Sequence, residues 1–227
     1  MADEFAQREL TAPDAEAIAK AHAIYTPFML SIYDLLVHGA SNHLAWRCPT
    51  RRLLDLYRAN LTANHLEAGV GTGHFLDREG GSDLKRLVLL DINRNCLARA
   101  ERRLARFKPT LCEANLLAPF KLELAPFSSI GLTYVLHCLP GRMSEKLKVV
   151  DHLQPLMERR AVLFGATILG RGIDSNWAAR TLLDFYNEKG VFNNREDDLR
   201  SLTDGLRERF DDVHIEMQGC VALFRAA

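Results

Sequence analysis

The sequence has few cysteines and lacks any long apolar run. Its cysteines are scattered, and no two stand at CxxC spacing: Cys48, Cys96, Cys112, Cys138 and Cys220. An odd, dispersed set argues against a disulfide framework or a zinc knuckle. No apolar run approaches the roughly 20 residues that cross a bilayer, and the acidic start lacks the order of a signal peptide. These absences predict a cytoplasmic protein with no membrane partner.

An excess of charge of one sign is also missing. The 227 residues carry 29 basic and 29 acidic side chains, so nothing favours a polyanionic partner, and we expect no nucleic acid. No two histidines stand at i and i+4 on one helix with a matching acid, so we expect no metal site. We interpret His65 and His74 as surface or packing residues. The length fits one α/β domain, whose oligomeric state the sequence leaves open.

Apolar spacing predicts alternating helices and strands. Helices are expected at residues 13–37, 49–60, 72–78, 93–107, 144–157, 175–188 and 196–210, and strands at 65–68, 86–90, 110–113, 129–135 and 161–166. This alternation favours a mainly parallel sheet with right-handed crossovers. The tail alternates from Val213 to Leu223 around Gly219, which predicts an antiparallel hairpin that closes a seven-stranded sheet.

A glycine-rich loop, Glu67–Gly73 (EAGVGTG), follows the first predicted strand. Its glycines let the backbone approach a ligand where a helix begins, which is typical of a nucleotide-like ligand. The spacing is GxGxG and not GxGxxG, which disfavours a dinucleotide. A carboxylate just before the glycines would repel phosphates but hold an α-ammonium group. Glu67 therefore predicts a ligand with a positive end.

Polar residues also follow the second and third predicted strands. Asp91 ends the second strand, 18 residues after Gly73, where a carboxylate can accept both hydroxyls of a ribose. Asn115 follows the third strand, where an amide can both donate to and accept from an adenine edge. The order and spacing of these motifs predict an adenosyl ligand more strongly than any one of them does.

The motifs resemble those of class I S-adenosylmethionine-dependent methyltransferases that act on small molecules. Residues 67–73 are similar to the first motif of that family, residues 91–93 to the ribose acid and its neighbours, and residues 115–116 to the adenine-side pair. Residues 127–141, which end in a Pro-Gly turn, are similar to the fourth-strand block. The resemblance covers roughly residues 60–227. It implies a Rossmann-like domain at residues 61–227 that binds S-adenosylmethionine.

The resemblance also implies a set of ligand contacts. The implied cofactor-binding residues are Tyr33, Glu67, Gly69, Gly71, Thr72, Gly73, Asp91, Ile92, Asn93, Asn115, Leu116, Thr133 and Tyr134. The chain departs from the family pattern at Glu67, Ser128 and Asn115, where aspartate is common. Glutamate keeps the charge, and asparagine can still donate to and accept from adenine.

Residues 1–60 are expected to form an N-terminal helical lid, because such a segment often covers the cofactor and substrate in this family. Closure of a lid excludes water from the reacting atoms. Tyr25, Tyr33 and Tyr134 are candidates to lie near the sulfonium, where aromatic faces favour a cation, although core packing also accounts for each of them.

The candidate catalytic residues are His137, Tyr134 and Tyr25. His137 follows the fourth strand, and the pKa of a histidine suits a general base near neutrality. Alternatively, His137 packs against the cofactor or caps the turn at Pro140. The arginines at positions 99, 102, 103 and 106 are interpreted as the solvated face of a helix.

The resemblance implies methyl transfer to a small-molecule metabolite, in keeping with secondary metabolism. Two alternatives stay open at this point. Some relatives of these enzymes use the sulfonium differently, either by cyclising its aminobutyrate arm to azetidine-2-carboxylate with release of methylthioadenosine or in a pericyclase-like role. A non-catalytic cofactor-binding subunit is the other alternative.

Overall fold

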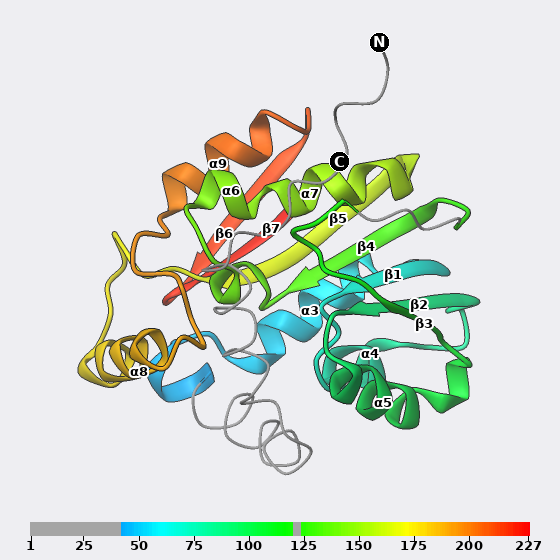
Figure 1. Cartoon of the computed structure of the whole chain (residues 1–227), viewed down its shortest axis with the longest axis horizontal. Helices are drawn as coiled ribbons and strands as arrows, with labels where there is room; N and C mark the ends of the chain where they lie inside the picture. Colours follow the sequence, from blue (N-terminus) through cyan, green and yellow to red (C-terminus); the bar gives the residue numbers. More distant parts are fainter. Residues whose placement is uncertain (1–41, 120–123) are drawn as a thin grey trace.

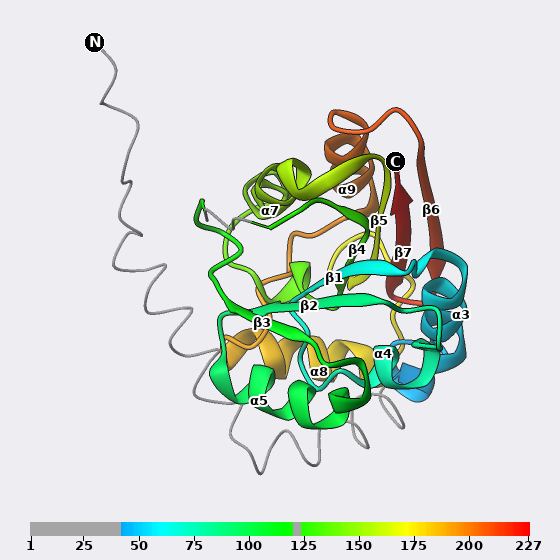
Figure 2. The same ribbon diagram turned by 90° about the vertical axis from the view of Figure 1, so that its right-hand side faces the viewer.

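The computed structural model describes residues 42–119 and 124–227, and a seven-stranded sheet forms its centre (Figures 1 and 2). The strand order is β3-β2-β1-β4-β5-β7-β6. The first five strands of this order run parallel, and β7 runs antiparallel to both β5 and β6. The sheet confirms the predicted Rossmann-like fold with an antiparallel C-terminal hairpin. Strands β1 to β3 are added toward one edge of the sheet and β4 and β5 toward the other, so the strand order reverses between β1 and β4, which is where open α/β sheets bind ligands.

The strands are β1 (Asn64–Ala68), β2 (Arg86–Asp91), β3 (Thr110–Glu113), β4 (Phe127–Thr133), β5 (Met157–Ile168), β6 (Val213–Gln218) and β7 (Val221–Ala226). Strands β5 and β4 differ most from the prediction. Strand β5 begins four residues before the predicted apolar run at residue 161, with exposed polar residues that an apolar criterion cannot detect. Strand β4 ends at Thr133 and not at residue 135, because Tyr134 has a left-handed backbone with φ 61°.

The helices are α3 (Thr50–Asn60), α4 (His74–Glu79), α5 (Arg94–Arg103), α6 (Met143–Lys146), α7 (Lys148–Leu153), α8 (Trp177–Glu188) and α9 (Leu199–Arg207). Helices α6, α7 and α9 cover one face of the sheet, and α3, α4 and α5 cover the other, with α8 on the same side (Figures 1 and 2). Each face has its own hydrophobic cluster, so the sheet is buried on both sides. Among the described helices, none combines the length and apolar character that a membrane crossing needs.

Helix ends differ from the prediction where caps and proline decide them. Asn176 and Asp198 accept hydrogen bonds from the backbone N–H of Ala179 and Ser201, each at 2.8 Å, so α8 and α9 begin later than predicted. The helix predicted at 144–157 is instead two short helices and a 3-10 turn. Pro155 lies in that turn and has no N–H to donate, which ends α7 at Leu153.

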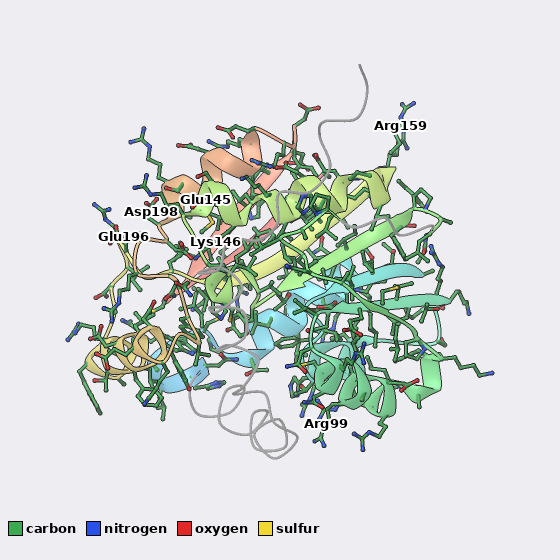
Figure 3. The ribbon with its side chains drawn as sticks, in the orientation of Figure 1. Arg99, Glu145, Lys146, Arg159, Glu196 and Asp198 are labelled. Atoms are coloured by element: carbon green, nitrogen blue, oxygen red, sulfur yellow. The ribbon has the colours of Figure 1, made fainter. Side chains whose placement is uncertain are left out.

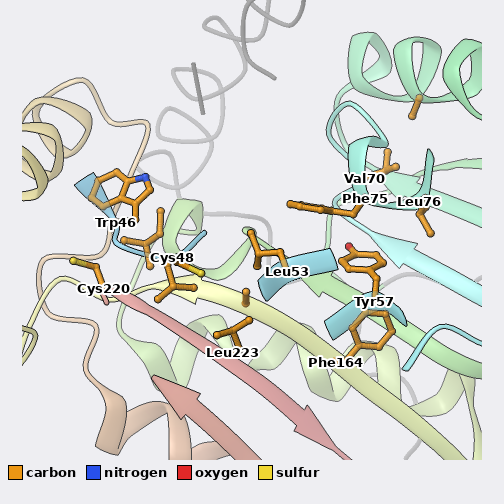
Figure 4. Packing of buried hydrophobic residues seen from close by; sticks show 14 of the residues in the cluster. Trp46, Cys48, Leu53, Tyr57, Val70, Phe75, Leu76, Phe164, Cys220 and Leu223 are labelled. Carbon is orange, nitrogen blue, oxygen red and sulfur yellow. The ribbon is translucent and has the colours of Figure 1, made fainter. Parts of the chain in front are cut away.

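Helix α3 lies within the segment predicted to form a lid, yet it packs against the sheet domain. Its residues Leu53 and Tyr57 belong to the same buried cluster as Phe164 of β5. Trp46 and Cys48, which precede the helix, are buried in that cluster as well (Figure 4). Residues 1–41, which include Tyr25, Tyr33 and the helix predicted at 13–37, lie outside the described residues.

Candidate cofactor-binding site

The predicted ligand residues gather where β1, β2 and β4 end, because these strands are parallel neighbours in the sheet. Glu67 of β1 is in register with Leu89 of β2 and Gly131 of β4. The loop that leaves β1 is anchored to the next strand by a hydrogen bond from Gly69 N to Leu90 O, at 2.7 Å. One edge of the sheet thus holds the glycine loop, Asp91 and the end of β4.

The glycine loop has a backbone that suits glycine. Gly69, Gly71 and Gly73 have φ of 74°, 54° and 71°, a region that L side chains rarely adopt. A Cβ added at Gly71 would project into open space with no atom within 4 Å. The loop thus presents bare backbone to that space, as a backbone that contacts a ligand must.

Arg103 of α5 holds the far side of this loop. Its Nη1 donates to both Thr72 O and Thr72 Oγ1, at 3.1 and 3.0 Å. Thr72 is buried, so its side chain supports the loop from within. The interpretation of Arg103 as part of a solvated face was therefore wrong, whereas Arg99 lies on the outer side of α5 (Figure 3).

Asp91 ends β2 beside the loop and is largely buried. Its Oδ2 accepts from Gly71 N at 3.3 Å, and its Oδ1 accepts from Asn93 N at 2.8 Å. Burial raises the pKa of Asp91 to about 6, although these backbone hydrogen bonds oppose the rise. Asn93 in turn caps α5, because its side-chain oxygen accepts a hydrogen bond from Asn95 N at 2.9 Å. Ile92, between Asp91 and Asn93 in the sequence, is partly exposed.

Glu67 lies at the end of β1 with only 4% of its surface exposed. The Tyr57 hydroxyl donates to Glu67 Oε1 at 2.5 Å, and His65 Nε2 lies 2.9 Å from Oε2. Its carboxylate faces the backbone of Gly131, where a Cβ would come within 2.4 Å of Oε2. Glu67 is therefore a fixed carboxylate directly before the glycine loop.

Asn115 and Leu116 follow β3, next to the end of β2. Ala114 N donates to Asp91 O at 3.2 Å, which brings this segment beside the predicted ribose acid. The Asn115 side-chain oxygen accepts from Leu117 N at 2.9 Å, and Leu116 is buried. Contacts of this pair with adenine stay a prediction.

Thr133 and Tyr134 end β4 on the other side of the glycine loop. Thr133 Oγ1 is buried close to the Tyr57 phenol, and its hydroxyl lowers the pKa of that phenol in opposition to the burial that raises it. Tyr134 combines its left-handed backbone with a hydrogen bond from its hydroxyl to Asn42 Oδ1, at 3.0 Å. Strained backbone of this kind is common at ligand sites.

His137 lies in a 3-10 turn after β4 and is 2% exposed. Burial and, to a smaller extent, the nearby charge of Lys146 lower its pKa to about 3, so the ring is neutral near pH 7. Its Nδ1 accepts from the backbone N–H of Ile168 at 3.3 Å, which places the ring proton on Nε2. The lone pair that a base would use is thus occupied. This geometry favours packing, the alternative interpretation of His137, over general-base catalysis.

Sequence patterns did not reveal all of the residues at this edge. Tyr57 was assigned only to the apolar face of a helix, and His65 to surface or packing, because their link to Glu67 requires β1, α3 and β4 to be assembled. Ser128 has no bearing on the edge, since it lies near the opposite end of β4 and donates to Glu158 at 2.9 Å. No group of three potential metal ligands occurs within the described part of the chain.

Comparison with known proteins shows the family. The chain is 37% identical over 213 residues to demethylluteothin O-methyltransferase of Streptomyces thioluteus, covering 93% of this chain and 92% of that protein. It is 34% identical over 206 residues to the physcion biosynthesis cluster O-methyltransferase of Aspergillus chevalieri, with coverage of 90% and 93%. No protein-family model matches the sequence.

Solved structures agree on the fold. The complex of DhpI with SAH matches with a TM-score of 0.68 at 14% identity, covering 93% of this chain and 97% of that one. The N-methyltransferase NodS of Bradyrhizobium japonicum WM9, in complex with S-adenosyl-L-homocysteine, matches with a TM-score of 0.58 at 15% identity and coverage of 91% and 97%. The full-length similarity to the curated relatives and the shared fold together show that the chain belongs to the class I S-adenosylmethionine-dependent methyltransferases and is a transferase.

Proposed function

We propose that this methyltransferase binds S-adenosylmethionine at the edge formed by β1, β2 and β4 and methylates a hydroxyl oxygen of a small molecule. The observation that carries the proposal is the bare backbone at Gly71, which faces open space and whose N–H donates to the carboxylate of Asp91. These groups fit the ligand, because the bare backbone lets a ligand come close and ribose hydroxyls can donate to Asp91.

The residues of the chain bind and orient the cofactor and the acceptor, and the cofactor carries the reactivity. When bound, S-adenosylmethionine supplies a methyl group on a positively charged sulfur. Asp91 would hold the ribose, Glu67 the α-ammonium, and residues 69–73 the backbone side of the ligand. Asn115 and Leu116 would contact the adenine, and the ring of Tyr134 would face the sulfonium. Tyr25 and Tyr33 stay candidates from the sequence alone.

The choice of oxygen as acceptor comes from the curated relatives, which are named O-methyltransferases. A small-molecule acceptor also agrees with the balanced charge of the chain, which does not favour a polyanionic partner. The geometry of His137 does not support it as the base, so we propose an acceptor that is acidic enough to ionise readily, such as a phenol or an enol. The free cysteines of the chain support a reducing, cytoplasmic location.

The products of the reaction test this proposal. The purified protein would be incubated with S-adenosylmethionine, first alone and then with a set of phenols and enols, and analysed by mass spectrometry. We expect S-adenosylhomocysteine and a product with one additional methyl group only when an acceptor is present. Methylthioadenosine formed without an acceptor would instead indicate cyclisation of the aminobutyrate arm. If calorimetry detected no binding of S-adenosylhomocysteine, the proposal would be wrong.

Binding should also depend on pH through Asp91. Ligand hydroxyls need the ionised carboxylate, and the pKa of Asp91 in the free protein is about 6. The carboxylate is therefore ionised above this pH and protonated below it, so binding weakens as the pH falls. We expect the Kd for S-adenosylhomocysteine to be about tenfold higher at pH 5 than at pH 7.5. Calorimetry at both pH values measures this, and Asp91→Asn should bind weakly with little difference between them.

A further inference from the structure

A continuous row of buried and partly buried polar side chains leads to the carboxylate that precedes the glycine loop. Thr62 lies 2.9 Å from Ser129 through their hydroxyl oxygens, and Ser129 Oγ lies 2.8 Å from His65 Nδ1. His65 Nε2 then lies 2.9 Å from Glu67 Oε2, and the Tyr57 hydroxyl reaches Oε1 from the opposite side. The row connects β4, β1 and α3 and ends at the carboxylate before the loop.

The hydrogen bonds at the Glu67 end of this row have a fixed direction. A carboxylate only accepts hydrogen bonds, so His65 Nε2 donates to Glu67 Oε2. Ser129 Oγ accepts from Thr62 N at 3.1 Å and contacts His65 Nδ1, which holds the ring in place. Tyr57 is held as a donor as well, because burial and the nearby Glu67 raise the pKa of its phenol well above the ordinary value. Both carboxylate oxygens of Glu67 thus receive one hydrogen bond each.

Packing leaves the Glu67 carboxylate little freedom to turn. Tyr57 is clamped between Phe75, whose ring stacks on it at 5.2 Å, and Phe164, whose ring meets it edge-on at 5.0 Å (Figure 4). Phe75 lies in α4, the helix that the glycine loop opens. On the other side, Gly131 gives the carboxylate the clearance that any Cβ would remove. The orientation of Glu67 is thereby coupled to the position of the loop.

The charge of Glu67 is only partly compensated by these neighbours. His65 is its one ion-pair partner in the described ranges, and no lysine or arginine there pairs with it. A buried carboxylate that receives one hydrogen bond at each oxygen keeps lone pairs that a cation can use, and such a carboxylate favours a nearby positive charge. An α-ammonium group in front of the loop would supply that charge.

We propose that Tyr57 and His65 are positioning residues that aim the Glu67 carboxylate at the α-ammonium group of the adenosyl ligand. The inference rests on the proposed function and extends it to two residues that do not themselves contact the ligand. It predicts that loss of either donor lowers the affinity for ligands that carry the amino-acid arm and leaves the affinity for ligands that lack it unchanged.

The test compares S-adenosylhomocysteine with methylthioadenosine, which has the same nucleoside but no amino-acid arm. In Tyr57→Phe, we expect the Kd for S-adenosylhomocysteine to rise about tenfold, since a hydrogen bond to a charged group is lost, and the Kd for methylthioadenosine to stay unchanged. Tyr186→Phe removes a phenol from a tyrosine packed on the same cluster but not hydrogen-bonded to Glu67, and should change neither Kd.

His65 provides a second, independent variant. His65→Gln keeps a side-chain N–H that can reach Glu67 and should bind S-adenosylhomocysteine within about threefold of the wild type, whereas His65→Leu should lose about tenfold. Thermal unfolding would show that each variant is folded at the temperature of the measurement.

The outcomes separate the two claims. If Tyr57→Phe or His65→Leu weakened both ligands by the same factor, the residues would act on the fold of the loop and the inference would be wrong, while the proposed function would stand. If neither variant changed either Kd, the inference would also be wrong. If the wild type bound neither ligand, the proposed function would fail together with the inference.

Discussion

Replacement of Gly71 by valine is expected to weaken binding of S-adenosylhomocysteine by at least about 100-fold while the protein stays folded. Two effects act in the same direction. The φ of 54° at this position is unfavourable for a β-branched residue, so the loop must shift. The added side chain also occupies the space in front of Gly71, which is open in the protein and which we assign to the ligand. Calorimetric titration of the variant measures the effect.

Gly190→Val is the matched control for this prediction. Gly190 has a φ of 69°, and a Cβ there also meets no atom within 4 Å, so the backbone strain and the free space are alike. It follows α8, away from the glycine loop. We expect a loss of thermal stability similar to that of Gly71→Val, with unchanged affinity for the ligand. Equal losses of affinity in both variants would contradict our placement of the ligand.

The parts of the fold that depend on near neighbours in the chain could be predicted from the sequence. Strand β3 was predicted with its observed bounds, and β2, whose apolar run is a local signal, needed only Asp91 added. Helix starts were less predictable. The caps at Asn176 and Asp198 compete with other polar residues nearby, and only the folded geometry shows which side chain accepts the hydrogen bond.

The site shows the same division. Glu67, Gly71 and Asp91 were predicted because each follows a strand at a spacing that is visible along the chain. The position of Thr133 and the contacts of Tyr57 and His65 at this edge depend on α3, β1 and β4 being assembled, and residues 69–126 separate β1 from β4 in the chain. His137 was placed correctly after β4, but its burial and the use of its Nδ1 by Ile168 are tertiary facts that its position in the sequence does not contain.

Removal of a buried ion pair between α6 and the segment before α9 is expected to have the largest effect on stability. Lys146 Nζ donates to Asp197 Oδ2 at 2.6 Å and to Asn193 O at 2.7 Å, and both charged side chains are at most 2% exposed. Asp197 O accepts from Gly170 N and Arg171 N, each at 3.0 Å, so the pair joins α6 to the loop before α9 and to the end of β5. Figure 3 shows Lys146 near the segment that carries Glu196 and Asp198.

Lys146→Met should lower the free energy of unfolding by about 3–5 kcal/mol, because the carboxylate of Asp197 would be left buried without a partner. Burial already raises the pKa of Asp197 and lowers that of Lys146, which shows that desolvation opposes both charges and that only their pairing offsets it. For a chain of this size the loss corresponds to a fall in Tm of roughly 10 °C. Thermal and urea unfolding of the variant would measure it.

Two further variants separate burial from charge pairing as the cause. Arg171 and Glu196 form an ion pair at 3.0 Å in the same region, but both side chains are at least 67% exposed, so Arg171→Met should cost less than about 1 kcal/mol. Combining Lys146→Met with Asp197→Leu removes the unpaired charge and should restore most of the stability, since apolar groups can replace a buried pair at little cost. A double variant as unstable as Lys146→Met alone would show that the ammonium group stabilises the protein chiefly through Asn193, whose N–H binds His137 O at 2.8 Å. In that case Lys146 would stabilise the protein by holding the loop that packs on His137, and not by pairing with the buried carboxylate.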